Sequence, residues 1–224
     1  MNVRKSPPPP AVNKGELITM DLDGNGGKQF RVLNCDGDIA EVINIDSNIS
    51  TRFGDNNTYN GSDLDVALNT TYYNTLSAEA KAAIVPKDIT QYQYTGNSSS
   101  VTAELYWGNA DYSTKSVKEK IGNRYIYALD IEDIFEKYLG SKGTSWSNGG
   151  TGTEEIKTLL NVTSTGLWLR SANENQLYAY YINGSGFIEG GRYAEHLITV
   201  TNDADAYARP AFQIDLSKIN YTRE

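Results

Sequence analysis

The C-terminal part of the chain decides the fold and is framed by two stiff stretches. The first reads Gly166-Leu167-Trp168-Leu169-Arg170-Ser171, and the second reads Ala208-Arg209-Pro210-Ala211-Phe212. Between them lie mostly Asn, Tyr, Asp, Gly, Ala and Ser, with little core-type periodicity. A segment whose two ends pack into the core, while its middle lacks a core pattern, is typical of a binding surface on a fixed scaffold. The pattern indicates a protein that binds rather than one that catalyses.

Composition excludes several classes of partner. The 224 residues suffice for one large domain or a domain with an appendage, and 39% hydrophobic content with 20 glycines and 16 tyrosines suits a loop-rich globular domain. The net charge of -8 disfavours nucleic acid and anionic membrane surfaces, because binding phosphates needs Lys and Arg. No apolar run approaches a membrane span, so no membrane insertion is expected. Cys35 alone permits neither an internal disulfide nor a cysteine metal cluster.

The chain is expected to consist of a tail and one domain. Residues 1–14 contain Pro7-Pro8-Pro9-Pro10, which favours polyproline II and is excluded from helices and central strands. This proline-rich linker or tail is either a stiff spacer or a disordered end. The domain is predicted to occupy residues 15–224.

The domain opens with strand signals. Short strands are predicted over residues 16–20, 28–34 and 39–45, joined by glycine-containing turns. Residues 21–26 also resemble the first half of a calcium loop, but the twelfth position of that loop is Val32 instead of Glu. The residues therefore favour a hairpin turn.

Helical spacing follows in three places. Ser62 and Ser77 are predicted to cap two helices, the second of which is stopped by Pro86. A third helix is predicted from Asp130 to Gly140, with its apolar stripe buried. These helices are interpreted as core elements without chemistry.

After an exposed loop predicted over residues 141–153, strand signals return. The expected strands are 167–170, 177–182, 196–200 and 207–214. Trp168 and Phe212 are assigned to the core, and Arg170 and Arg209 are expected to hold strand ends together through polar contacts. The predicted fold class is α+β, with short antiparallel strands and a few packed helices.

Five motifs in order resemble a bacterial and phage family of uncharacterised domains with a C-type-lectin-like fold. They cover roughly residues 15–216 and are Lys28-Gln29-Phe30-Arg31-Val32-Leu33, Gly61-Ser62-Asp63-Leu64 leading to Ala67-Leu68-Asn69 and Tyr72-Tyr73, Tyr125-Ile126-Tyr127-Ala128-Leu129-Asp130, Trp168-Leu169-Arg170-Ser171 and Arg209-Pro210-Ala211-Phe212. This family is similar to formylglycine-generating-enzyme-like folds. The resemblance implies a C-type-lectin-like domain.

Some members of that family are the variable proteins of diversity-generating retroelements, in which a reverse transcriptase miscopies adenines. The resemblance implies a variable segment over residues 172–207, where Asn codons drift to Tyr, Asp, Ser and similar residues. Residues that match this palette are Asn173, Asn175, Tyr178, Tyr193, His196, Asn202, Asp203, Asp205 and Tyr207. Residues that depart from it are Glu174, Gln176, Glu189 and Glu195, and the segment 186–209 is longer than the plain domain implies.

The residue types support recognition independently of the resemblance. Tyr provides a large contact area while only a few side-chain torsions have to be fixed on binding. Asn, Ser and Gly adapt their hydrogen bonds to the ligand, and antibody paratopes use the same mixture. Tyr178 and Tyr180 share a face of their strand and are both predicted to point outward, so Tyr180 joins the candidate ligand-binding residues.

Catalysis and metal binding find little support. His196 is the only histidine and lies in the segment expected to vary, and no nucleophile elbow is present. Asp203 and Asp205 could ligate calcium, but two aspartates in a turn are more often solvated loop residues. No enzyme activity, cofactor or metal is predicted.

Two classes of function remain. The first is a non-enzymatic, hypervariable protein that binds a protein or glycan receptor on another cell, from a virion tail or a cell surface. The second is a structural or adhesin spacer of lectin-like fold without a diversified site. The sequence leaves the oligomeric state open.

Overall fold

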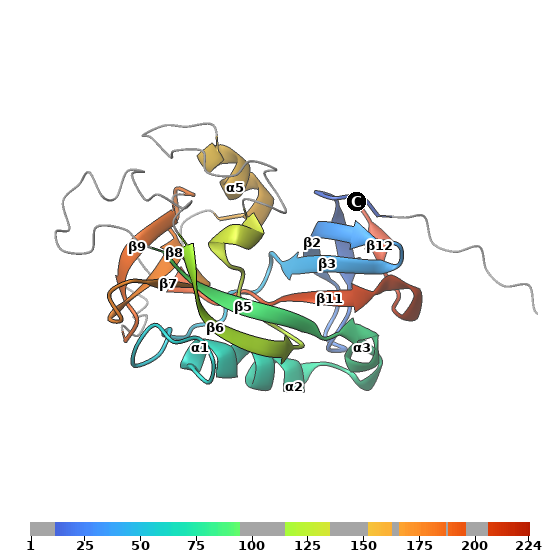
Figure 1. Ribbon diagram of the computed structural model, residues 1–224. Helices are drawn as coiled ribbons and strands as arrows, with labels where there is room; N and C mark the ends of the chain where they lie inside the picture. Colours follow the sequence, from blue (N-terminus) through green and yellow to red (C-terminus); the bar gives the residue numbers. More distant parts are fainter. Residues whose placement is uncertain (1–11, 95–114, 135–151, 163–165, 187, 196–205) are drawn as a thin grey trace, which may run out of the picture.

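The computed structural model describes residues 12–94, 115–134, 152–162, 166–186, 188–195 and 206–224. Two sheets form the framework, and short helices lie against them (Figure 1). The fold is α+β and rich in antiparallel strands, as predicted. No helix in these ranges is long and apolar enough to cross a membrane.

The first sheet is antiparallel throughout and has the order β12-β1-β2-β3-β11-β4. Its strands are β1 Leu17–Met20, β2 Lys28–Asp36, β3 Ile39–Asn44, β4 Ile84–Val85, β11 Ala211–Asp215 and β12 Thr222–Arg223. The three predicted N-terminal strands are thus confirmed within about two residues. Strand β12 pairs with β1, so both ends of the described chain lie at one edge of this sheet.

The turn between β1 and β2 uses the carboxylates that resembled a calcium loop. Asp21 Oδ1 accepts the N–H of Gly24 at 2.8 Å, and Asp23 Oδ1 accepts the N–H of Asn25 at 2.9 Å. Gly24 has a φ of 77°, a conformation that glycine adopts without a Cβ penalty. The hairpin-turn interpretation is therefore confirmed.

The second sheet has the order β6-β5-β7-β8-β9, and β10 pairs with β7. Its strands are β5 Lys87–Tyr94, β6 Lys115–Arg124, β7 Gly166–Asn173, β8 Tyr178–Ile182, β9 Ile188–Tyr193 and β10 Ala206–Tyr207. Strand β7 runs parallel to β5 and β10 and antiparallel to β8. Every residue of β7 is buried, so both of its faces are covered.

Both predicted serine caps are confirmed. Ser62 Oγ accepts the N–H of Asp65 at the start of α1 (Asp63–Val66), and Ser77 Oγ accepts the N–H of Ala80 at the start of α3 (Ala78–Ala83). A π-helical segment η1 (Ala67–Tyr72) and the short α2 (Tyr73–Thr75) continue α1.

The remaining helical elements only partly match the sequence prediction. A helical turn over residues 131–134 follows Asp130 as expected, but residues 135–151 lie outside the described ranges. Helix α5 (Gly152–Leu160) was missed, because its first residues continue a Gly-, Ser- and Thr-rich stretch. A 3-10 turn, η3 (Leu216–Lys218), follows β11.

The core joins both sheets. Trp168 and Phe212 are fully buried, which confirms their assignment. Phe212 packs edge-on against Phe30 of the first sheet, and Trp168 packs edge-on against Phe53. Such aromatic pairs add to the stabilisation from the apolar area that they bury.

Candidate functional site

The predicted ligand-binding residues fall into three groups. Asn173, Asn175, Tyr178, Tyr180 and Tyr207 have described side chains. Tyr193 is described through its backbone, which places it directly opposite Tyr178 in the β8–β9 pairing. The residues outside the described ranges are His196, Asn202, Asp203 and Asp205.

Tyr180 corrects the prediction that it points outward with Tyr178. Its side chain is 2% exposed and packs edge-on against Tyr94. A Cβ added at Gly190 would come within 2.5 Å of the Tyr180 ring, so Gly190 on β9 provides the space for that ring. The error arose because β8 is covered on both faces beyond Tyr178, whereas strand alternation assumes one face in water.

Asn173 also belongs to the scaffold. It is 6% exposed, its Nδ2 donates to the Gly190 carbonyl at 2.8 Å, and its Oδ1 accepts the N–H of Asn175 at 2.9 Å. The side chain therefore connects β7 to β9 and starts the following turn.

The exposed part of this region is the turn between β7 and β8, residues 174–177, here called the β7–β8 turn. Glu174, Gln176 and Leu177 are exposed, and Leu177 remains 48% accessible. Asn175 and Tyr178 are half-buried. Sequence reasoning missed the exposed residues because Glu174 and Gln176 do not fit the Asn-derived palette.

Asn57 fixes the backbone of this turn from beneath. Its Nδ2 donates to the carbonyls of Asn173, Asn175 and Tyr178 at 2.8, 3.0 and 2.6 Å. Its backbone N–H donates to the Gln176 carbonyl at 2.9 Å. Asn57 is fully buried, so these bonds are shielded from water.

Asn57 is itself held by two side chains of the second sheet. Gln91 on β5 donates through Nε2 to the carbonyls of Asn57 and Arg170, both at 2.7 Å. Lys118 on β6 donates to Asn57 Oδ1, and burial lowers the pKa of this ammonium group. The turn thus rests on a continuous polar connection to β5 and β6.

Tyr207 lies elsewhere. It pairs with Leu167 at the start of β7, whereas the turn begins after Asn173 at its end. Six residues of extended strand separate these positions by about 20 Å. Tyr207 is therefore separate from the predicted ligand-binding residues beside the β7–β8 turn.

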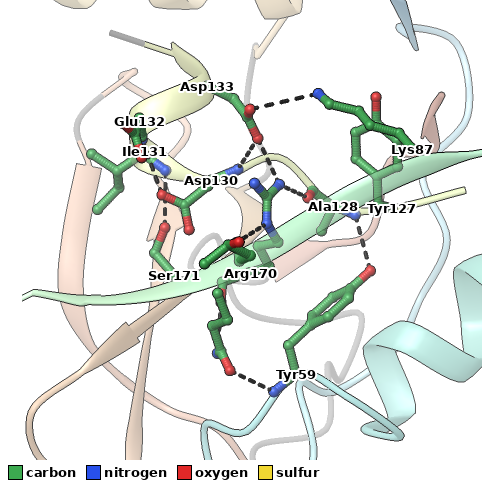
Figure 2. Close-up of polar contacts among 12 residues, drawn as sticks. Tyr59, Lys87, Tyr127, Ala128, Asp130, Ile131, Glu132, Asp133, Arg170 and Ser171 are labelled. Carbon is green, nitrogen blue, oxygen red and sulfur yellow. Dashed lines mark hydrogen bonds and ion pairs between the residues drawn. The ribbon is translucent and has the colours of Figure 1, made fainter. Parts of the chain in front are cut away.

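A second polar cluster surrounds Arg170 beneath the sheet (Figure 2). Its Nη1 donates to Asp133 Oδ2 at 2.6 Å and to the Ala128 carbonyl at 2.7 Å, while Nε donates to the Thr90 carbonyl at 3.0 Å. Burial lowers the pKa of Arg170, but the carboxylates of Asp133 and Asp130 outweigh it and raise this pKa above its ordinary value.

Asp130 and Asp133 cap the helical turn reciprocally. Asp130 Oδ1 accepts the N–H of Glu132 at 3.0 Å, and Asp133 Oδ2 accepts the N–H of Asp130 at 2.9 Å. Asp130 Oδ1 also accepts the hydroxyl of Tyr94 at 2.6 Å. Burial, reinforced by Asp133, raises the pKa of Asp130 despite the opposing charge of Arg170.

Lys87 extends this cluster to the first sheet. Its ammonium group contacts Glu41 Oε1 at 2.6 Å and lies 3.9 Å from Asp133 Oδ1, and the Tyr127 hydroxyl donates to Glu41 Oε1 at 2.8 Å. Arg170 and Lys87 are paired with the carboxylates of Asp133 and Glu41, whereas Asp130 Oδ2 is buried without a hydrogen-bond partner among the described residues. The ion pairs of the cluster join elements of the fold. Among the described residues, no three His, Cys, Asp or Glu side chains are grouped so as to hold a metal ion.

Comparison with known proteins identifies the family. No curated protein and no solved structure matches the chain. Residues 38–216 match the sequence profile of a family described as a domain of unknown function, DUF6273. This range contains β3, β4 and β11 of the first sheet, every strand of the second sheet, the Arg170 cluster and the β7–β8 turn. The protein is a member of the DUF6273 domain family.

Proposed function

We propose that this protein is a non-enzymatic ligand-binding domain with a C-type-lectin-like scaffold, whose C-terminal surface is diversified by a retroelement. The observation that carries ligand binding is the β7–β8 turn, whereas diversification rests on the family resemblance, because Glu174 and Gln176 depart from the Asn-derived palette. The turn exposes Glu174, Gln176 and Leu177 while its backbone is hydrogen-bonded to a fully buried side chain. Fixed backbone with exposed, chemically mixed side chains is the arrangement that recognition surfaces use.

The division between framework and surface supports the same proposal. Trp168, Arg170 and Arg209, which belong to the motifs that frame the segment, are at most 5% exposed. Substitutions between these motifs would alter contacts with a ligand more readily than the core, because surface changes away from packed positions are usually tolerated.

The proposed ligand is a protein or glycan receptor on another cell, with the domain carried on a virion tail or a cell surface. A small turn supplies modest affinity at each site. Display of several copies would raise the overall avidity without new contacts.

The test of diversification is the DNA beside the gene. We expect a near-copy of the segment encoding residues 166–210 that differs only where the copy carries adenines, next to a reverse transcriptase gene. A search of that DNA that finds neither would remove diversification from the proposal.

A structural or adhesin spacer is the second candidate, and one observation favours it. Asn173 and Tyr180 were predicted to contact a ligand, but both are buried. Screening the purified protein against arrays of glycans and cell-surface proteins separates the two candidates. A spacer would bind none of them, whereas a receptor-binding domain would lose its partner when Gln176 and Leu177 are exchanged for Ser.

A further inference from the structure

The main chain of the β7–β8 turn is held by hydrogen bonds from Asn57 and Ala194. The carbonyls of Asn173, Asn175 and Tyr178 accept from Asn57 Nδ2, and the Gln176 carbonyl accepts from the Asn57 N–H. The Leu177 carbonyl accepts the N–H of Ala194 at 2.9 Å. Backbone carbonyls are present whatever side chain a residue carries, so these bonds do not depend on the identity of the residues in the turn.

The donor is set in a rigid position. Asn57 and Gln91 are fully buried, and Gln91 also accepts the N–H of Tyr59 through Oε1 at 3.0 Å. Lys118 contacts the oxygen of the Asn57 amide, which orients its nitrogen toward the turn. A buried amide whose donors and acceptor are all satisfied is costly to displace.

We propose that Asn57 is a positioning residue that fixes the backbone of the β7–β8 turn for any side chains at positions 176 and 177. These two positions are then specificity-determining ones of the described surface. This deepens the ligand-binding part of the proposed function and rests on it, because it states which exposed positions can change without reshaping the turn.

Asn173 does not belong to the positions that can change without reshaping the turn. Its side chain bonds the Gly190 carbonyl and the N–H of Asn175, so replacing it would break contacts that a backbone anchor cannot supply. Asn175 is intermediate, since its Oδ1 accepts the N–H of Leu177 at 3.1 Å in addition to the backbone contact.

Hydrogen exchange followed by mass spectrometry on the full chain tests this proposal. Asn57→Leu keeps the side-chain size but removes both donors and the acceptor. We expect exchange in peptides covering residues 173–178 to accelerate about tenfold or more, as the loss of a buried hydrogen-bonding partner implies. The double variant Gln176→Ser, Leu177→Ser should exchange like the unmodified protein there. Asn74→Leu, at an exposed asparagine of α2, is the matched control and should change nothing in this region.

Two results would overturn the proposal: unchanged exchange in Asn57→Leu, or accelerated exchange in the double variant. If Asn57→Leu loses its cooperative melt, Lys118→Met replaces it as the milder change. Acceleration over residues 173–178 in Lys118→Met then supports the proposal, and its absence overturns it. No ligand enters these measurements, so their outcome is distinct from that of the search for the adenine-specific DNA repeat.

Discussion

Arg170 and Arg209 are both buried guanidinium groups beside helix ends, but they contact opposite ends in opposite ways. Arg170 reaches the start of the 131–134 turn through a carboxylate, since Asp133 binds both Arg170 and the N–H of Asp130, the residue before the turn. Arg209 reaches the end of α5 directly, donating to the carbonyls of Leu160 and Asn161.

The pKa values of the two arginines move in opposite directions, because only Arg170 has buried carboxylates beside it. The carboxylates raise the pKa of Arg170 above its ordinary value. Burial lowers the pKa of Arg209 to about 10, and the charge of Asp46 offsets only part of this. A helix start presents N–H groups, so a cation serves it only through an anion, whereas a helix end presents carbonyls that accept from a cation directly.

The largest effect is expected for Arg170→Met. Removing the cation leaves Asp130 and Asp133 buried without the charge of Arg170, and the free energy of unfolding should fall by about 3–5 kcal/mol in urea denaturation. Arg223→Met at the exposed β1–β12 edge is the control and should cost little.

If Arg170→Met does not fold, the double variant Arg170→Met, Asp133→Leu should recover part of the stability, because it also removes the buried anion that has lost Arg170. An Arg170→Met protein as stable as the original would contradict the role of this cluster.

The contribution of the Arg170 cluster to stability should also depend on pH, which distinguishes it from the surroundings of Arg209. The pKa of Asp130 is raised in the folded state, so the unfolded chain loses this proton at lower pH than the folded chain. Stability relative to Asp130→Asn should therefore fall as pH rises from the ordinary carboxyl pKa to the raised one. Thermal melts of both proteins across this range provide the measurement. If the stability of the original protein relative to Asp130→Asn rises with pH, the pKa of Asp130 is not raised in the folded state.

A smaller loss is expected for Arg209→Met. This variant frees the carbonyls at the end of α5 but leaves no buried anion, so unfolding should become easier by about 1–3 kcal/mol. Exchange in peptides covering residues 152–162 should accelerate, with peptides from α3 as the internal control. A loss as large as that of Arg170→Met would mean that the two arginines do not differ as described.

The smallest effect is expected for Arg31→Met. Arg31 Nε donates to the Leu159 carbonyl at 3.2 Å and Nη1 donates to the Gly15 carbonyl at 2.7 Å, and the residue is only partly buried. We expect a loss of about 1 kcal/mol, measured by the same denaturation. Additive losses in Arg31→Met, Arg209→Met would show that the two arginines act independently on α5, and a smaller combined loss would show that either one suffices.

Local signals in the sequence predicted local structure well. Ser62 and Ser77 act as N-caps because a cap needs only the following turn, and Asp130 was found in the same way. The buried aromatic residues Trp168 and Phe212 followed from their apolar strands.

Features that depend on distant partners were not predictable. Arg170 and Arg209 were expected to hold strand ends together through polar contacts. Arg170 does join β7 to β5 through the Thr90 carbonyl, but both arginines also contact helix ends that the sequence does not place beside them. Asn57 and Asn56 look alike in sequence, and only the fold buries one beneath residues 173–178 and leaves the other exposed. The prediction that Tyr180 points outward was wrong, because nothing in the sequence of its own strand indicates that other residues cover this face.

The pairing of β12 with β1 has a practical consequence for binding assays. The Glu224 N–H donates to the Leu17 carbonyl, so both ends of the described chain leave the molecule at the same edge. Strands β8 and β9 lie at the opposite end of the molecule (Figure 1). Immobilising the protein on a sensor surface through Glu224 would therefore leave the β7–β8 turn facing the solution, where soluble receptors can reach it.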